Sequence, residues 1–326
     1  MSFWHSSDAS ALISTHHPLS YCDRFRIRQP ADSQFALGPH ADGGSVERWE
    51  EAGYGLGKIY DPIFRGELGR YDPWESSGRS RVCMDLYRGP SACSVFRMFQ
   101  GWLSMSETGP GEGTLLVNPL FDRATAYYLL RPFFEPKVAR DKVCKEQYLD
   151  KDNWQLKTSM DSSLDGAFPS QCLEFSDETH PHLELERSMI HVPKVNPGDY
   201  VVWHCDSKFP PLSYILRSLT QSTAIHAVDA CHRGITDSSV LYIPATPLTV
   251  SNAKYIATQC EHFFRGIPPP DFPGGVGESK HVGRPTLDEF KNIEKKGRQA
   301  MGVQGFSVED GLEPDFVKEV NAALKL

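Results

Sequence analysis

The chain has 326 residues, of which 40% are hydrophobic and 23% charged, so it can bury a substantial core. Its formal net charge of −8 is spread along the sequence, and no basic run interleaved with aromatic residues appears, which argues against a nucleic-acid partner. No apolar run approaches the roughly 20 residues that span a bilayer, and the first residues lack the apolar stretch of a signal peptide. We therefore expect a cytoplasmic protein without a membrane partner, and its eight scattered cysteines, which form no C-x-x-C pair, predict reduced thiols.

Short apolar or alternating segments separated by turn residues predict a mostly β protein with flanking helices. Residues 94–104 and 114–118 are expected to pair as a hairpin, residues 124–130 to form a short buried helix, and residues 150–179 to form loops. Many short strands favour a sandwich or jelly roll. The strand candidates are residues 19–29, 94–104, 114–118, 183–192, 200–204, 224–228 and 238–243.

The character of the chain changes after Pro247. Thr249 is suited to cap a helix that ends near Arg265, with Gly266 closing it. A capping-box pattern at residues 286–289 predicts a second helix through about residue 296, stopped by Gly297. A third amphipathic segment covers residues 314–324. We predict a domain over residues 1–248 and a helical C-terminal appendage over residues 249–326.

The most informative stretch is the turn that contains His40 and Asp42, flanked by Gly38-Pro39 and Gly43-Gly44. Glycines on both sides allow a strained backbone and close approach of another group. A His-x-Asp pair joined by a distant histidine makes a facial triad, which leaves half of the coordination sphere of iron open.

Three downstream histidines compete for the distal ligand position: His204, His226 and His232. A histidine in a pleated strand must point inward to reach the metal, while its neighbours point away. His226 lies within an apolar strand candidate, and we favour it over His204 as the alternative. Each of them is otherwise explained as a core histidine that donates a hydrogen bond to a carbonyl.

The chain carries six informative blocks, at residues 37–50, 99–103, 109–115, 203–206, 225–228 and 237–244. In this order they resemble the YbiU-like family, a group of domains of unknown function similar to the Fe(II)- and 2-oxoglutarate-dependent dioxygenases near the phytanoyl-CoA hydroxylase branch. The resemblance covers roughly residues 15 to 265. It implies a double-stranded β-helix (jelly-roll) core in which His40, Asp42 and His226 bind iron.

Two departures from the family pattern stand out. The chain is short before Gln29, so we expect a covering layer of helices to be missing. Residues 207–224 read as an insertion between the two histidine-bearing blocks. If this insertion breaks the strand, His226 does not reach the metal and the chain is inactive.

The far carboxylate of 2-oxoglutarate needs a cation, because a charge-assisted pair fixes it in a dry pocket. Related enzymes often place an arginine on the strand after the distal histidine, and residues 237–242 contain none. Arg97, Arg28 and Arg233 are the candidates, each of which is otherwise a surface ion pair. Trp49, Gln100 and Trp102 are expected to line the pocket, although tryptophans are usually core residues.

Together these features predict an Fe(II)/2-oxoglutarate-dependent dioxygenase that hydroxylates an unidentified small molecule with molecular oxygen. The alternative is an inactive jelly-roll protein that binds or scaffolds. A third interpretation is a cupin-like site that holds zinc or manganese without the oxo acid. The sequence leaves the substrate and the oligomeric state open.

Overall fold

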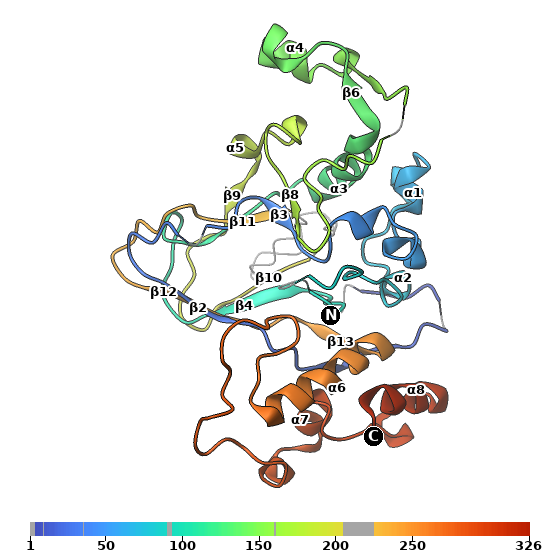
Figure 1. Ribbon diagram of the computed structural model, residues 1–326, viewed down its shortest axis with the longest axis vertical. Helices are drawn as coiled ribbons and strands as arrows, with labels where there is room; N and C mark the ends of the chain where they lie inside the picture. Colours follow the sequence, from blue (N-terminus) through green and yellow to red (C-terminus); the bar gives the residue numbers. More distant parts are fainter. Residues whose placement is uncertain (1–3, 9, 35, 90–92, 160, 205–224) are drawn as a thin grey trace.

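Antiparallel sheets with helices around them make up the structure, a computed structural model that describes residues 4–8, 10–34, 36–89, 93–159, 161–204 and 225–326 (Figure 1). The strands are β1 (Ile13–Leu19), β2 (Phe25–Arg28), β3 (His40–Ala41), β4 (Gln100–Ser104), β5 (Leu115–Val117), β6 (Phe134–Pro136), β7 (Trp154–Leu156), β8 (Leu173–Glu174), β9 (Ile190–His191), β10 (Tyr200–Trp203), β11 (His226–Val228), β12 (Ser238–Tyr242) and β13 (Thr246–Thr249). The α-helices are α1 (Asp61–Phe64), α2 (Ser76–Arg79), α3 (Phe121–Leu130), α4 (Lys145–Leu149), α5 (Leu185–Ser188), α6 (Val250–Arg265), α7 (Lys295–Ala300) and α8 (Pro314–Leu324). Helices and several antiparallel sheets share the described residues, so this part of the chain is mixed α/β rather than mostly β.

Two larger sheets lie one above the other in Figure 1. The four-stranded sheet has the order β10-β4-β12-β2, and the five-stranded sheet has the order β8-β3-β11-β5-β9. Each sheet therefore gathers segments that are distant in the sequence, and the pairings of its named strands are antiparallel. The described strands close no barrel, and the jelly roll stays a prediction.

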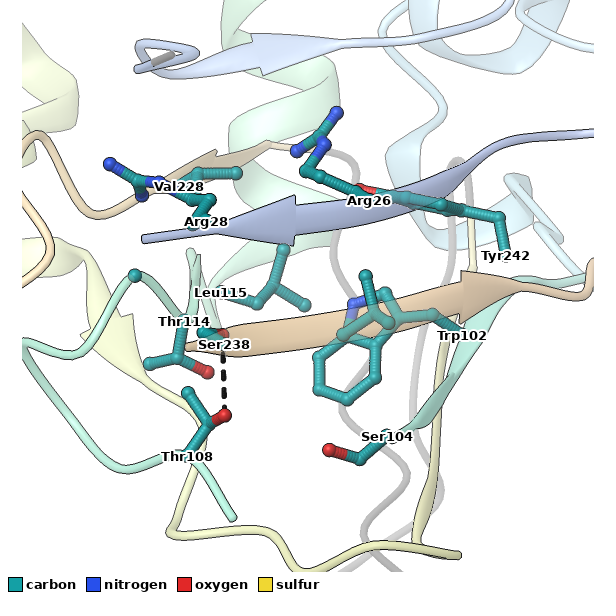
Figure 2. A pocket seen from close by; sticks show the side chains of 12 residues that line it. Arg26, Arg28, Trp102, Ser104, Thr108, Thr114, Leu115, Val228, Ser238 and Tyr242 are labelled. Carbon is teal, nitrogen blue, oxygen red and sulfur yellow. Dashed lines mark hydrogen bonds between the residues drawn. The ribbon is translucent and has the colours of Figure 1, made fainter. Parts of the chain in front are cut away.

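The alternation of residues along β2 turns two arginines toward the space between these sheets (Figure 2). Arg26 and Arg28 line that space, whereas Phe25 and Ile27 are 54% and 53% exposed on the opposite face. Successive side chains of a strand point to opposite faces, so the pattern follows from strand geometry.

The C-terminal helices share a core with the first strand. β13 pairs with β1, and Leu19 packs in one buried cluster with Leu248 of β13, Ile256 of α6 and Val320 of α8. The Thr249 side chain accepts a hydrogen bond from the Asn252 amide at 3.0 Å and caps α6 as predicted. Gly266, at φ +67°, ends this helix as predicted. The division into residues 1–248 and 249–326 stays a prediction.

Most predicted elements contain the expected structure, but several predictions need correction. The predicted hairpin is wrong, because β4 lies in the four-stranded sheet and β5 in the five-stranded sheet. Residues 183–192 are mainly helical turns, with α5 beginning after Glu184 at φ +44°, and only β9 is a strand. The expected loop at residues 150–179 also contains the short strands β7 and β8.

The predicted helix over residues 286–296 is wrong. Thr286 does donate two hydrogen bonds to the Glu289 carboxylate, at 2.6 and 3.1 Å, but only a 3-10 turn (Glu289–Asn292) follows. Within that turn Phe290 alone is buried, and a short helix needs a buried apolar face for stability. Gly297, the expected stop, lies inside α7.

Among the described residues, no helix combines the length and the apolar character needed to cross a bilayer. The described cysteines are free thiols, as predicted.

Candidate metal centre

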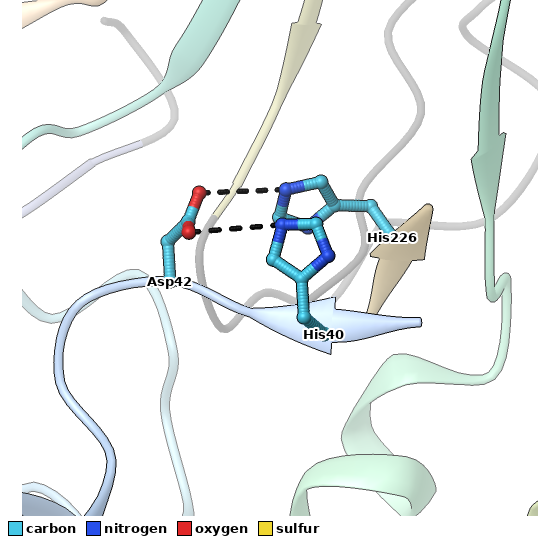
Figure 3. A group of neighbouring side chains, drawn as sticks. All are labelled: His40, Asp42 and His226. Atoms are coloured by element: carbon cyan, nitrogen blue, oxygen red, sulfur yellow. Dashed lines mark ion pairs between the residues drawn. The ribbon is translucent and has the colours of Figure 1, made fainter. Parts of the chain in front are cut away.

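His40, Asp42 and His226 come together on one face of the five-stranded sheet (Figure 3). His40 of β3 and His226 of β11 stand directly opposite each other in the strand register, so their side chains leave the same face. Their ring centroids are 4.2 Å apart. The Asp42 carboxylate oxygens lie 3.7 Å from His40 Nε2 and 3.4 Å from His226 Nε2. One ligand atom from each residue lies within 4.8 Å of the other two, which is the spacing of a metal site.

Hydrogen bonds orient two of the three side chains. His40 Nδ1 lies 2.7 Å from the Gly38 carbonyl oxygen, to which it donates, and this contact leaves Nε2 as the lone-pair nitrogen facing Asp42. Gln100 Nε2 donates to Asp42 Oδ2 at 2.5 Å. Such outer contacts fix the orientation of metal ligands and tune their basicity.

The protonation states also suit metal binding. Burial, together with the neighbouring His226, lowers the pKa of His40 to about 4, so its imidazole is neutral at pH 7. Desolvation acts to raise the pKa of Asp42, but the hydrogen bond from His226 and the nearby His40 hold it well below its ordinary value. A neutral imidazole and an ionised carboxylate are the forms that bind a metal ion.

A buried arginine holds the backbone of the His-x-Asp turn. Arg48, 1% exposed, donates to the Asp42 carbonyl oxygen at 2.6 Å and to the Tyr60 hydroxyl at 2.7 Å. Its guanidinium also lies 5.0 Å from the ring centroid of Tyr54, whose hydroxyl donates to the Gly43 carbonyl oxygen at 2.6 Å. Side chains of the two 3-10 turns that follow β3 thus donate hydrogen bonds to the Asp42 and Gly43 carbonyl oxygens and fix the backbone there.

Gly44, like its neighbour Gly43 at φ +83°, is a glycine that another residue replaces only with strain. Its φ is +84°, a conformation that side chains disfavour. A Cβ there would also lie 2.6 Å from the Met84 carbonyl oxygen.

An inner cavity of about 520 Å³ begins at the three candidate ligands and lies between the two larger sheets. A further space of about 430 Å³ adjoins it, and the two share four wall residues, including Arg26 and Tyr242 (Figure 2). Besides the ligands, the inner cavity is lined by Asp23, Arg24, Arg26, Leu37, Arg97, Gln100, Gly101, Leu115, Trp203, Val228, Tyr242 and Pro244.

A second, outer pocket of about 860 Å³ also reaches His40 and Asp42. Its walls come from the His-x-Asp turn, the following 3-10 turn and β8. A metal ion held by His40 and Asp42 would therefore face both the inner cavity and the outer pocket, which also share Arg24 and Leu37.

Of the three arginines predicted to bind a carboxylate, only Arg97 lines the inner cavity. Burial acts to lower its pKa, but Cys93 and Asp42 raise it above the ordinary value, so its charge is retained. Arg28 lines only the adjoining space, where it donates to the carbonyl oxygens of Asp229 and Asp32 at 2.7 and 2.8 Å. Arg233 is exposed and outside both lining sets.

Of the other predicted site residues, some lie at the centre and some lie away from it. Gln100 lies at the centre, whereas Trp102, two residues further along β4, lines the adjoining space and not the inner cavity. His204, the alternative distal ligand, is fully buried elsewhere and stacks on Trp4 with ring centroids 4.3 Å apart. Desolvation lowers the pKa of His204 well below its ordinary value.

His232, the third candidate, is also away from the centre. Its Nε2 donates to the Thr236 carbonyl oxygen at 2.9 Å, which agrees with the alternative of a core histidine that donates a hydrogen bond to a carbonyl. Trp49 packs beside the core and donates its indole N–H to the Leu129 carbonyl oxygen at 2.9 Å. The predicted insertion at residues 207–224 lies outside the described residues, and His226 nevertheless faces His40.

Two residues of the site were missed at the level of sequence. Arg26 lies in the strand candidate at residues 19–29, where nothing in the sequence distinguishes it from Arg24 and Arg28. Arg48 carries no motif, and its role depends on the fold of the turns after β3.

Comparison with known proteins finds relatives that match most of this chain at about 30% identity. The chain is 32% identical over 300 residues to the uncharacterized protein YbiU of Escherichia coli K12, covering 92% of this chain and 58% of that protein. The crystal structure of GlcNAc Inducible Gene 2 from Candida albicans superposes with a TM-score of 0.79 at 30% identity, covering 99% of this chain and 65% of that one. A Salmonella typhimurium LT2 structure named "Putative Oxidoreductase" gives a TM-score of 0.69 at 29% identity, covering 92% and 61%. The chain thus spans about three fifths of the length of these relatives.

The Gig2-like family model matches residues 1–303. This match includes every residue of the candidate centre and both large sheets. The chain belongs to the Gig2-like family.

Proposed function

We propose that the chain is an Fe(II)- and 2-oxoglutarate-dependent oxygenase that hydroxylates a small molecule in the cytoplasm. The observation that carries the proposal is the convergence of His40, Asp42 and His226 within 4.8 Å, at the entrance of a cavity lined by cations. Two stacked antiparallel sheets that enclose this cavity support a jelly-roll interpretation of the core. The name of the Salmonella relative agrees with redox chemistry in the family.

The donor set fits ferrous iron. Two neutral imidazoles and one carboxylate on one side of an ion form the facial triad of non-haem iron oxygenases, which leaves positions for a 2-oxo acid and oxygen. When bound, iron and 2-oxoglutarate supply the activation of oxygen, with decarboxylation to succinate. His40, Asp42 and His226 would hold the ion, and Gln100 would keep the Asp42 carboxylate in its orientation.

Arg26 and Arg97 would bind the far carboxylate of 2-oxoglutarate. Both line the inner cavity, and Arg26 lies over the ring of Tyr242 with its Cζ 5.2 Å from the centroid. Desolvation lowers the pKa of Arg26, yet an arginine remains charged at pH 7. Leu115 and Val228 form apolar walls of the same cavity, which exclude water and strengthen charge-assisted hydrogen bonds.

The test is anaerobic addition of Fe(II) and 2-oxoglutarate to the purified chain. A weak visible charge-transfer band and, after admission of air, succinate formation are expected. His40→Ala should lose both signals. Metal binding without succinate would favour a zinc- or manganese-binding cupin-like site, and the absence of metal binding would favour an inactive jelly-roll protein. Either outcome rejects the oxygenase.

A further inference from the structure

The outer pocket contains a buried acidic side chain that the proposed metal centre does not use. Glu47 is 2% exposed, lines this pocket, and accepts one hydrogen bond, from the Ser45 amide to its Oε2 at 2.8 Å. No cation among the described residues forms an ion pair with it. The neighbouring Arg48 turns away, to the Asp42 carbonyl oxygen.

A second carboxylate stands across the same pocket. Glu174 of β8 lies directly opposite His40 in the strand register, so its side chain leaves the sheet on the face that carries His40. It also lines the outer pocket. The two acids therefore reach the space beside the candidate metal ligands from different elements.

The cationic side chain of this pocket is already engaged. Arg24 lines it, but its Nε lies 3.5 Å from an Asp23 oxygen and its Cζ lies 4.6 Å from the ring centroid of Phe272. The remaining walls include the apolar side chains of Leu37 and Met84. The pocket thus offers hydrogen-bond acceptors and carbon surface.

A buried carboxylate that lacks a cationic partner is costly unless donors satisfy it, and a bound ligand can supply those donors. We propose that the outer pocket binds a substrate with a short carbon skeleton that presents hydrogen-bond donors, from an amine or from hydroxyl groups, to Glu47 and Glu174. This inference rests on the proposed function for its claim that the ligand is a substrate, because His40 and Asp42 line the same pocket.

The binding claim is testable without iron or 2-oxoglutarate. The chelator-treated chain is titrated with 1,4-diaminobutane and, separately, with sorbitol, and binding is followed by ligand-observed NMR. At least one probe should bind saturably. Loss of one charged acceptor should weaken the amine probe about tenfold in Glu47→Gln and in Glu174→Gln. An amide still accepts hydrogen bonds, so sorbitol should weaken only about threefold.

Glu51→Gln is the matched control, because Glu51 is an exposed acid of the same segment outside the pocket lining, and it should bind like the wild type. Glu174 is exposed, so its variant remains informative if Glu47→Gln fails to fold. The inference is overturned if neither probe saturates, or if both variants bind both probes like the wild type. Because the assay omits iron, a negative result here leaves the oxygenase proposal intact, and a lack of succinate leaves the binding result intact.

Discussion

Replacing Arg48 by methionine tests whether the backbone of the His-x-Asp turn is held from outside the centre. The change keeps much of the buried side-chain volume but removes the hydrogen bonds to the Asp42 carbonyl oxygen and the Tyr60 hydroxyl. A hydrogen bond from a charged donor contributes about 1.5–3 kcal/mol, so the loss of two should lower the free energy of unfolding by about 3–6 kcal/mol. Loss of an outer contact to a metal ligand typically weakens metal affinity by about 10–100-fold, and we expect a loss in that range.

The assay is anaerobic equilibrium dialysis against Fe(II), with urea unfolding measured on the same preparations. Tyr60→Phe is the control, because it removes one partner of Arg48 and leaves the contact with Asp42. It should lower the free energy of unfolding by about 1.5–3 kcal/mol and leave iron affinity within about twofold of the wild type. A folded Arg48→Met chain with wild-type iron affinity would refute this reasoning.

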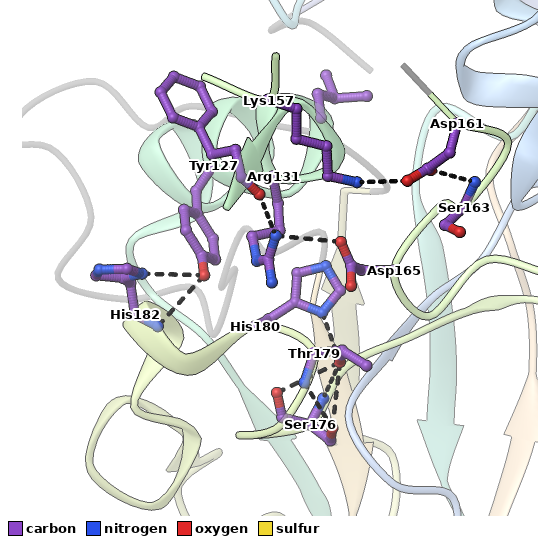
Figure 4. A network of polar contacts seen from close by, with 12 residues as sticks. Tyr127, Arg131, Lys157, Asp161, Ser163, Asp165, Ser176, Thr179, His180 and His182 are labelled. Carbon is purple, nitrogen blue, oxygen red and sulfur yellow. Dashed lines mark hydrogen bonds and ion pairs between the residues drawn. The ribbon is translucent and has the colours of Figure 1, made fainter. Parts of the chain in front are cut away.

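Three further predictions concern separate parts of the molecule. Arg26→Leu should weaken the apparent affinity for 2-oxoglutarate by about 10–100-fold, because a charge-assisted pair is lost. The control Arg233→Leu, at an exposed arginine, should leave this affinity unchanged. Equal affinities in the two variants would remove Arg26 from the site. Gly44→Ala should lower the free energy of unfolding, measured in urea, by about 1–3 kcal/mol, because position 44 has a positive φ and lies close to the Met84 carbonyl oxygen. A change under about 0.5 kcal/mol would contradict this prediction. His180, whose Nδ1 lies 2.9 Å from the Thr179 hydroxyl oxygen (Figure 4), has a pKa that burial lowers to about 3. The unfolded chain therefore takes up this proton first, and the free energy of unfolding should fall as pH drops from about 6.5 toward 3. His180→Phe should flatten this dependence, and an unchanged pH profile would count against the prediction.

The local chemistry of the sequence predicted much of the candidate centre. Glycines around His40 and Asp42 indicated a site turn, and the apolar residues beside His226 indicated an inner strand. Both features depend on neighbours within a few residues, and the structure has a turn and a strand there. The helix capped by Thr249 and the helix that begins at Pro314 were predictable for the same reason, since the cap of the first and the amphipathic pattern of the second are local.

Long-range pairing was not predictable in the same way. The turn after β4 resembles a hairpin connection, but the chain crosses to the other sheet, because β4 pairs with β10 and β12. The choice between Arg26, Arg28 and Arg97 likewise depends on which positions of distant strands face the same cavity. At Thr286 the local capping pattern formed as predicted, but no helix followed, because the residues after it lack the buried apolar face that would stabilise one.

The central claim is that two imidazoles and a carboxylate bind one ferrous ion. Anaerobic dialysis of the purified chain against Fe(II), followed by determination of iron per chain, tests it most directly. We predict one ion per wild-type chain and its loss in His40→Ala, Asp42→Ala and His226→Ala, while His191→Ala, at a partly exposed histidine outside the centre, retains it. A wild-type chain that binds no iron, or three variants that bind it as tightly as the wild type, would contradict the account.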